Sequence, residues 1–447
     1  MGFLITGPYF THREIVCVHS FSKFIDTGRG FTHGKNETWG CKTSAEMEIS
    51  NVRSWVYRKI LFIVSLWSIM SKGKPEKNRR INVPDEAWEE YIIDADFHLN
   101  LFDPKEYLEY IEDPRLKKKI EVGGIPKGVT GGWVFPYAHH IADSLNTQGT
   151  ALVAEEIDGL KKQYAIDAVI VGPGMINLPT ARYPIVKNAI VKAYNDYIVD
   201  KVIDVKNGIY GLAIVPQWDP AACVEEIERM KDEKGIVGVQ GWYSPQTLFG
   251  AIEYEEMHRE LVKEKLPLVL HGSGFTSRFD LLGNSMKSVV EALTLSWTYN
   301  AMANVLNLIF TGTFDRHEDL KVVIQEAGTN WVPFASLRAD ECYYALPEDV
   351  MLSHRMFEDG NDYLKHMPSE YFFKNMYYTT QPIALPKNPD HVKSMFEMCR
   401  ASETFLYSSD WPHNTFDPPN WLFNNRGIDK ETRARICHGN SKEVFGI

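Results

Sequence analysis

The chain has 447 residues, of which 44% are hydrophobic and 24% are charged, and its formal net charge is −11. This composition is that of a soluble globular protein, and the acidic balance argues against nucleic-acid binding, which needs a basic surface. The six cysteines are scattered without a CxxC pair, so we expect no structural zinc on cysteine and a reduced, cytoplasmic setting.

The N-terminal part of the chain differs from the rest. Its most apolar run, LFIVSLWSIM at residues 61–70, is shorter than the roughly 20 residues that span a bilayer and lies too far along the chain for a signal peptide. We therefore expect no membrane attachment. We expect residues 1–69 to be a poorly structured N-terminal extension, or translation of the native chain to begin at Met70. A linker over residues 70–90 would then lead into a catalytic domain over residues 91–447.

From residue 92 onward, short β-branched segments alternate with longer amphipathic segments. A loop-rich insertion, about residues 101–150, follows the first predicted strand, and a helical pattern follows each later one. One of these helices opens with Asp219 and Pro220, which are typical of the N-cap and the first position of a helix. The segments that predict strands are IIDADFHL (92–99) and residues 165–173, 210–216, 236–242, 266–273, 320–328, 375–381 and 405–411.

Apolar strands that alternate with helices predict a parallel sheet covered on both faces. Eight such units predict the α/β class, specifically a (β/α)8 TIM barrel with an N-terminal extension and an inserted loop after strand 1. An open, doubly wound sheet is the alternative. That fold should show a glycine-rich loop after its first strand, and IIDADFHL is followed by none.

Polar side chains recur where the predicted strands end. In a barrel of this kind the C-terminal ends of all strands meet at one face, and catalytic groups collect there. Residues far apart in the sequence are therefore expected to converge on one centre. They are Asp96 and His98 on the first strand, His271 on the fifth, Glu326 on the sixth and Asp410 on the eighth.

Four of these residues, Asp96, His98, His271 and Asp410, make a coherent set of metal ligands. Imidazole nitrogen and carboxylate oxygen suit a divalent ion such as Zn²⁺ or Mn²⁺. Each residue alone has an ordinary structural interpretation, as a core histidine or as a turn aspartate before Trp-Pro. Their joint placement on three strands predicts one divalent metal ion, with Zn²⁺ expected first and Mn²⁺ as the alternative.

Six motifs occur in one order along residues 90–447: IIDADFH, PLVLHGS, HEDLKVVIQEAGTNWVP, PSEYFFKNMYYTTQP, YSSDWPH and HGNSKEVFGI. In this order they resemble the amidohydrolase-related family, in the branch similar to aminocarboxymuconate-semialdehyde decarboxylase and the resorcylate-type decarboxylases. That family consists of metal-dependent TIM barrels, so the resemblance implies the same fold and a bound metal. Its members often pair as dimers, which implies a homodimer acting on a small-molecule substrate.

The resemblance also implies roles for single residues. His98, His271 and Asp410 match metal ligands of the family, and Asp410 matches a residue that also transfers protons. Asp96 stands where the family often has histidine, but carboxylates occur there in the decarboxylase branch, so Asp96 is still expected to bind metal. Glu326 stands where characterised decarboxylases have histidine; a carboxylate there can act as a general base or, with a raised pKa, as an acid. The expected catalytic residues are therefore Asp410, Glu326 and His271.

Other residues near the predicted strand ends are candidates for substrate contact. His139 and His140 lie in the insertion after strand 1, where such a loop can cover a barrel mouth or remain solvated. Trp242, at the end of strand 4, and Trp411 could line the pocket, whereas the remaining aromatic residues are expected to pack between barrel and helices. Asp94 is better interpreted as a buried structural carboxylate. The candidate substrate-binding residues are His139, His140, Trp242, Trp411, His413 and Asn100.

Three functions fit these residues. The first is a hydrolase that uses a metal-activated water on a small, aromatic or carboxylate-bearing substrate. The alternative is a non-oxidative decarboxylase (carboxy-lyase) of a small aromatic or unsaturated carboxylic acid, which Asp96 favours and Glu326 disfavours. The third is a non-catalytic barrel, and the retained ligand residues argue against it.

Overall fold

A computed structural model describes residues 83–99, 108–123, 153–173, 184–243, 247–272, 289–353, 363–412 and 416–447. These stretches belong to one compact unit, Arg80–Ile447. The predicted extension, residues 1–69, lies outside the described residues, as does most of the predicted linker. The end of that linker contains a short helix, α2 (Asp85–Glu89).

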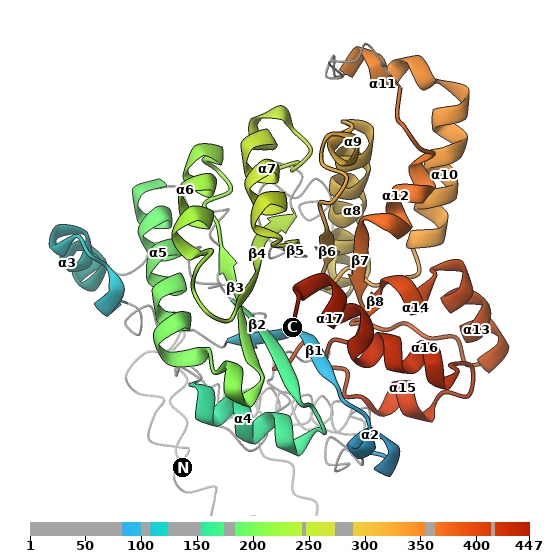
Figure 1. Cartoon of the computed structure of the whole chain (residues 1–447), viewed down its shortest axis with the longest axis horizontal. Helices are drawn as coiled ribbons and strands as arrows, with labels where there is room; N and C mark the ends of the chain where they lie inside the picture. The colour runs from blue at the N-terminus through green and yellow to red at the C-terminus, as the bar shows by residue number, and fades with distance from the viewer. Residues whose placement is uncertain are drawn as a thin grey trace, which may run out of the picture. The chain divides into compact units, whose positions relative to one another are not determined.

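A single sheet of eight parallel strands, in the order β1 to β8, forms the centre of the fold (Figure 1). The ring closes through the backbone: Ala95 N–H donates to the Tyr407 carbonyl and His98 N–H to the Trp411 carbonyl, both at 2.9 Å. The predicted (β/α)8 barrel is confirmed, and the open-sheet alternative is wrong. The strands are β1 (Ile93–Leu99), β2 (Ala168–Pro173), β3 (Ile209–Ile214), β4 (Ile236–Tyr243), β5 (Leu268–Gly272), β6 (Val322–Ile324), β7 (Met376–Thr379) and β8 (Phe405–Leu406).

Two strands are much shorter than the sequence predicted. The segments 320–328 and 405–411 retain only three residues in β6 and two in β8. Both segments leave the extended conformation where a functional side chain must turn toward the barrel axis: Glu326 has φ +52° and Asp410 has φ +59°. A left-handed residue does not continue a regular β-ladder, so neither strand runs through its polar residue; β8 already ends at Leu406, four residues before Asp410.

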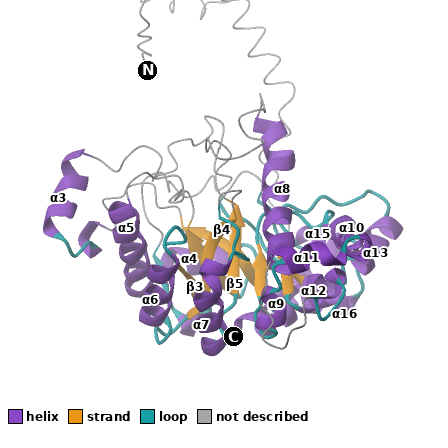
Figure 2. Ribbon diagram, turned by 90° about the horizontal axis from the view of Figure 1, so that it is seen from above, coloured by secondary structure: helices purple, strands orange, loops and turns teal. Residues whose placement is uncertain are grey.

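The helices lie outside the strands (Figure 2). The predicted helix start at Asp219 is confirmed, because its side chain accepts a hydrogen bond from Ala222 N–H and Pro220 follows at the first position. The helices of the first half are α3 (Pro114–Gly123), α4 (Ala154–Gln163), α5 (Pro184–Tyr197), α6 (Pro220–Met230), α7 (Glu255–Glu264), α8 (Val289–Phe310) and α9 (Thr313–Arg316). The later ones are α10 (Val332–Ala345), α11 (Pro347–Ser353), α12 (Pro368–Lys374), α13 (Pro389–Met398), α14 (Ala401–Thr404), α15 (Asn420–Asn424), α16 (Lys430–Ala434) and α17 (Asn440–Phe445).

The apolar core has two parts. The larger part fills the space between strands and helices. The smaller part lies inside the barrel, where Val444 and Phe445 of α17 pack with inward residues such as Ile93, Val269 and Leu406. This interior cluster leaves the C-terminal ends of the strands to polar side chains.

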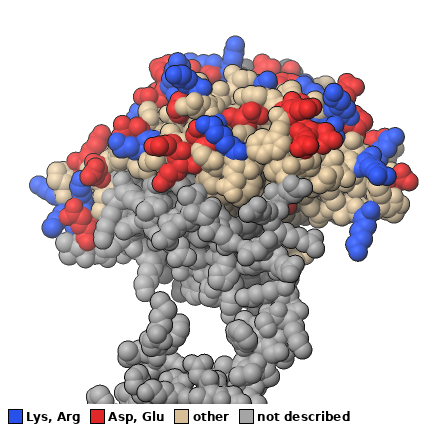
Figure 3. Space-filling view, turned by 90° about the horizontal axis from the view of Figure 1, so that it is seen from below, with Lys and Arg blue, Asp and Glu red and all other residues tan. Residues whose placement is uncertain are grey.

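The surface carries charges of both signs. On the face shown in Figure 3, the acidic and basic side chains of the described residues are interspersed. Within the described stretches, no helix is both long and apolar enough to cross a membrane.

Candidate metal centre

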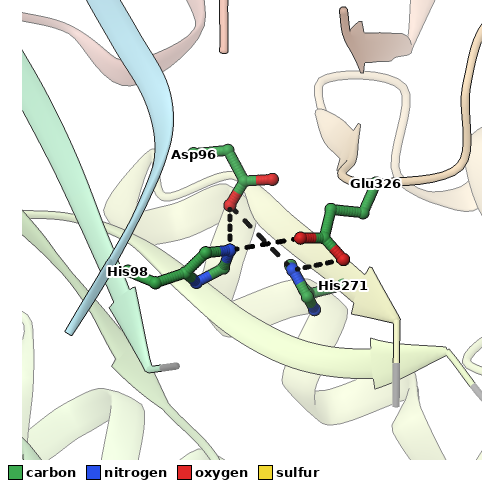
Figure 4. Close-up of side chains that lie close together, drawn as sticks. All are labelled: Asp96, His98, His271 and Glu326. Atoms are coloured by element: carbon green, nitrogen blue, oxygen red, sulfur yellow. Dashed lines mark ion pairs between the residues drawn. The ribbon is translucent and has the colours of Figure 1, made fainter. Parts of the chain in front are cut away.

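Four polar side chains meet at the C-terminal ends of the strands (Figure 4). Each offers one donor atom, and these atoms all lie within 4.8 Å of one another. We call this set the barrel ligand group; it consists of Asp96 and His98 of β1, His271 of β5 and Glu326 two residues after β6. All four residues are buried.

The shortest separations run between imidazole and carboxylate. Nε2 of His98 is 3.3 Å from Oδ1 of Asp96 and 3.4 Å from Oε1 of Glu326. Nε2 of His271 is 3.4 Å from Oε2 of Glu326 and 4.0 Å from Oδ1 of Asp96. Two nitrogen and two carboxylate donors that converge in this way match the chemistry of a divalent-metal site.

The predicted ligand set and the observed group differ by one residue. Oδ1 of the buried Asp410 lies 3.2 Å from Nε2 of His98, so Asp410 borders the group without being one of its four members. Glu326, which we had expected only to transfer protons, takes the fourth place. A carboxylate at a strand end could have identified Glu326 as a ligand. We assigned it a catalytic role instead, because the resembling decarboxylases have a catalytic histidine at that position. Coordination by Asp410 stays a prediction.

The backbone is strained at both carboxylates beyond β6 and β8. A left-handed conformation costs a non-glycine residue on the order of 1–2 kcal/mol, and such residues gather at functional sites. Glu326 is held by a hydrogen bond from its N–H to Oγ1 of Thr379, at 3.2 Å. The N–H of Asp410 donates to the carbonyl of Asp96, at 3.0 Å, which links β8 to the first strand.

Asp94 has the structural role that the sequence predicted. Its Oδ1 accepts hydrogen bonds from the N–H groups of Ser409, at 2.9 Å, and Asp96, at 3.1 Å. Its Oδ2 accepts one from the Ser409 hydroxyl. Burial raises the pKa of Asp94 to about 7, and the hydrogen bonds from Ser409 oppose that rise. Asp94 thus connects the segments that carry Asp96 and Asp410.

The buried carboxylates of the barrel ligand group favour binding of a cation. Burial raises the pKa of Asp96 to about 7; the carboxylates of Glu326 and Asp410 add to the rise, and the two histidines oppose it. Burial alone would lower the pKa of His98, but Asp96, Asp410 and Glu326 outweigh it and raise that pKa well above its usual value. Three buried carboxylates around two imidazoles leave negative charge that a divalent ion would compensate.

The hydrogen bonding of the group also fits a metal. Nδ1 of His271 lies 2.8 Å from the Gly272 carbonyl, which can only accept, so Nδ1 carries a proton and Nε2 faces the group; in the neutral imidazole Nε2 offers a lone pair there. That Nε2 atom and both carboxylate oxygens of Asp96 are buried and make no hydrogen bond. Buried polar atoms are normally paired, so these three atoms fit the role of metal-coordinating donors.

Sequence analysis did not identify the polar contacts beneath the group. Nε2 of Gln325 reaches across the barrel and donates to the carbonyl of Ala95, at 2.7 Å. The hydroxyl of Tyr243 donates to the carbonyl of Gln325, at 2.9 Å. These contacts hold the strand that leads into Glu326. A glutamine and a tyrosine near strand ends carry no motif of their own, so only their three-dimensional neighbours reveal them.

The predicted substrate-binding residues fall into two sets. Trp242 is buried in the apolar core, and its backbone is held by Gln217. Trp411 is also buried and stacks on Phe97, with ring centroids 4.9 Å apart. Both therefore pack in the interior of the protein, and substrate contact by either stays a prediction. The remaining candidates, Asn100, His139, His140 and His413, lie outside the described residues.

The chain matches one protein-family model and is similar in sequence to known decarboxylases. Residues 93–447 match the model of the amidohydrolase family. A γ-resorcylate decarboxylase of Polaromonas sp. is 23% identical over 279 residues, which cover 58% of this chain and 77% of the relative. A second γ-resorcylate decarboxylase, from Rhizobium sp., is 21% identical over 267 residues, covering 58% of this chain and 76% of the relative.

Solved structures show the same fold. The 5-carboxyvanillate decarboxylase of Novosphingobium aromaticivorans, complexed with manganese and 4-hydroxy-3-methoxy-5-nitrobenzoic acid, superposes with a TM-score of 0.61 at 16% identity. The match covers 84% of this chain and all of the other. At this level of identity the likeness extends to the barrel fold and not to a particular activity.

Proposed function

The chain belongs to the amidohydrolase family, and from this premise we propose that it is a metal-dependent, non-oxidative decarboxylase of a small aromatic carboxylic acid. The observation that carries the proposal is the position of Asp410, whose Oδ1 lies 3.2 Å from Nε2 of His98 at the edge of the barrel ligand group. An acid in that position can deliver a proton to a substrate bound there. The decarboxylase activity named for the similar sequences supports this function over hydrolysis, which we had expected first.

We propose Mn²⁺ as the ion that Asp96, His98, His271 and Glu326 hold. Carboxylate oxygens suit Mn²⁺, and imidazole accepts either Mn²⁺ or Zn²⁺. The manganese in the similar 5-carboxyvanillate decarboxylase supports this choice over Zn²⁺. When bound, such an ion supplies Lewis acidity and draws electron density from the substrate oxygens.

In this proposal Asp410 performs the proton transfer. Its carboxyl group donates a proton to the ring carbon that bears the substrate carboxylate. The bond between that carbon and the carboxylate then breaks, its electron pair returns to the ring, and CO₂ leaves. Water restores the proton on Asp410. Burial of the surrounding carboxylates excludes bulk water and strengthens each of these interactions.

Hydrolysis remains a second candidate because of one observation. Glu326 places a carboxylate 3.4 Å from each of two imidazoles, where it can accept a proton from water. If Glu326 serves as this base rather than as a ligand, ester, lactone or amide cleavage becomes the favoured reaction.

One experiment separates the two functions. The full chain is stripped with a chelator, reloaded with Mn²⁺ or Zn²⁺, and offered 2,6-dihydroxybenzoate, 5-carboxyvanillate and other hydroxybenzoates alongside a panel of esters, lactones and amides. We expect CO₂ and the decarboxylated arene in equal amounts, only after metal is restored. Cleavage of the second panel without CO₂ from the first would establish a hydrolase instead. Assembly as a homodimer and a cytoplasmic setting stay predictions.

A further inference from the structure

A second cluster of metal-ligating side chains lies on α7 and directly after α9. Both helices belong to the layer outside the strands (Figure 1). The cluster consists of Glu255 and His258 of α7 and His317, the residue after α9, with donor atoms within 4.8 Å of one another. Oε1 of Glu255 lies 2.8 Å from Nε2 of His317. The rings of His258 and His317 meet edge to face, with centroids 5.7 Å apart. Glu255 and His258 are three residues apart on a helix, so they share one face of α7.

His258 is the residue that an ordinary packing role does not explain. It is 1% exposed; the backbone of Phe249 lies near its ring, but neither ring nitrogen reaches good hydrogen-bond geometry with any partner. A buried polar group without a partner is rare in folded proteins. Since one of these nitrogens lies beside the Glu255–His317 pair, a ligand bound between the three side chains would satisfy it.

Charges around the cluster indicate which ion would bind. Nε of Arg316 is 3.0 Å from Oε2 of Glu255, so the guanidinium occupies one carboxylate oxygen and leaves Oε1 for His317. Arg259, the other cation facing His317, is paired with the exposed Glu256. An arginine this close disfavours hard ions that depend on charge alone, such as Ca²⁺ or Mg²⁺.

The donor atoms favour an ion that prefers nitrogen ligands. Imidazole nitrogen is a ligand that Zn²⁺ prefers, and His258 and His317 supply two of the three donor atoms. Two imidazoles and one carboxylate are a common ligand set for Zn²⁺, with a fourth position left for water. The Glu255 side chain is 19% exposed, which gives solvent access to that position.

We propose that Glu255, His258 and His317 form a second divalent-cation site that binds Zn²⁺. The site joins two segments that lead to the barrel ligand group. α7 precedes β5, which carries His271, and His317 precedes β6, which leads into Glu326. A bound ion would therefore hold α7 against the segment after α9, next to the strands that lead to His271 and Glu326. The proposal does not depend on the activity assigned above, because its ligands lie outside the barrel.

Metal content of the full chain tests the site. A parent variant carrying His98→Ala and His271→Ala removes two barrel ligands; it is stripped with a chelator, incubated with Zn²⁺, desalted and analysed by plasma mass spectrometry. We expect about one equivalent of Zn²⁺ in this parent and less than about a tenth after His258→Gln is added. His391→Gln changes an exposed histidine on α13 and should leave the zinc content unchanged. A parent that holds no zinc, or zinc that survives His258→Gln, overturns the proposal.

A second measurement covers the case in which the parent variant does not fold. Chelator-stripped wild-type protein and the single variant His258→Gln are titrated with Co²⁺, and circular dichroism verifies that both are folded. We expect about one more equivalent of Co²⁺ in the wild type, with a visible absorption band that the variant lacks. Equal stoichiometry and identical spectra in the two proteins refute a second site.

Discussion

Asp94 of β1 and Ser409 beyond β8 are joined by two hydrogen bonds, although 315 residues separate them in the sequence. Each stands next to a residue of the candidate centre: Asp94 is two residues before Asp96, and Ser409 directly precedes Asp410. Ser409 Oγ also accepts a hydrogen bond from the N–H of Trp411, at 3.1 Å. The pair therefore fixes the two carboxylates relative to each other across the seam where the barrel closes.

Replacing Asp94 with asparagine should disturb that seam while conserving size. An amide nitrogen at the Oδ1 position would face two N–H donors, and at the Oδ2 position it would force the Ser409 hydroxyl to change from donor to acceptor. Either arrangement weakens the seam and removes the carboxylate charge. Residues that orient metal ligands typically contribute about 10- to 100-fold to affinity or activity. We expect kcat to fall by that factor, measured with the best substrate of the decarboxylation panel. Ser409→Ala should give a smaller loss, since the backbone N–H of Ser409 remains; unchanged kinetics in Asp94→Asn would contradict the positioning role.

Asp410→Asn separates proton transfer from metal binding. Asparagine keeps one oxygen but cannot deliver a proton, and general acid catalysis is worth about 10²- to 10⁴-fold. We expect CO₂ release to fall by that factor while most of the metal is retained, as measured by plasma mass spectrometry. Asp390→Asn, at an exposed aspartate in the first turn of α13, is the matched control. An Asp410→Asn protein with full activity would remove Asp410 from the mechanism.

Removal of a histidine ligand should abolish metal binding as well as activity, unlike Asp410→Asn. His271→Ala deletes Nε2, which is 3.4 Å from Glu326, and leaves buried carboxylates without that donor. We expect bound Mn²⁺ to drop below about a tenth of an equivalent, and activity to disappear with it. Equilibrium dialysis against Mn²⁺ measures the loss. Retention of a full equivalent of Mn²⁺ would show that His271 is not a ligand.

Glu326→Gln tests the residue that the structure added to the ligand set. The substitution keeps the shape of the side chain but removes the charge that faces both imidazoles. We expect the Kd for Mn²⁺ to rise by at least about 10-fold, because an amide is a weaker ligand than a carboxylate. Glu341→Gln, at an exposed glutamate on α10, should leave the Kd unchanged. If Mn²⁺ binding is normal and only turnover falls, Glu326 acts as a proton carrier, as the sequence first suggested.

The metal-free protein should lose stability as the pH rises through neutrality. The raised pKa of Asp96, about 7, lies above that of an unfolded aspartate, and the pKa of His98 is raised as well. The folded state therefore binds more protons than the unfolded state, and stability falls as these protons leave. We expect the Tm of chelator-stripped protein to decrease from about pH 5 to about pH 8. Mn²⁺ should reduce the slope, because the ion replaces the protons; a Tm that rises with pH in the stripped protein would contradict the electrostatics described.

The sequence by itself determined the fold and indicated which side chains meet at one end of the barrel. Alternation of apolar strands with helices predicts a covered parallel sheet, and polar residues that end the strands of a barrel meet at one face. Asp96, His98 and His271 were expected there because they stand at strand ends, and the family resemblance supported them as ligands. The capped helix start at Asp219 was equally local, since a cap depends on a few adjacent residues.

Only the tertiary structure decided how the residues beyond the strands are used. Glu326 and Asp410 lie where the backbone becomes left-handed, so strand periodicity no longer states where their side chains point. Their positions depend on bonds to Thr379 and Asp96, which come from other strands. The cluster of Glu255, His258 and His317 likewise joins segments 62 residues apart in sequence. Local sequence determines where side chains point within a regular strand or helix. Which side chains of different elements meet is decided by the packing of the whole barrel.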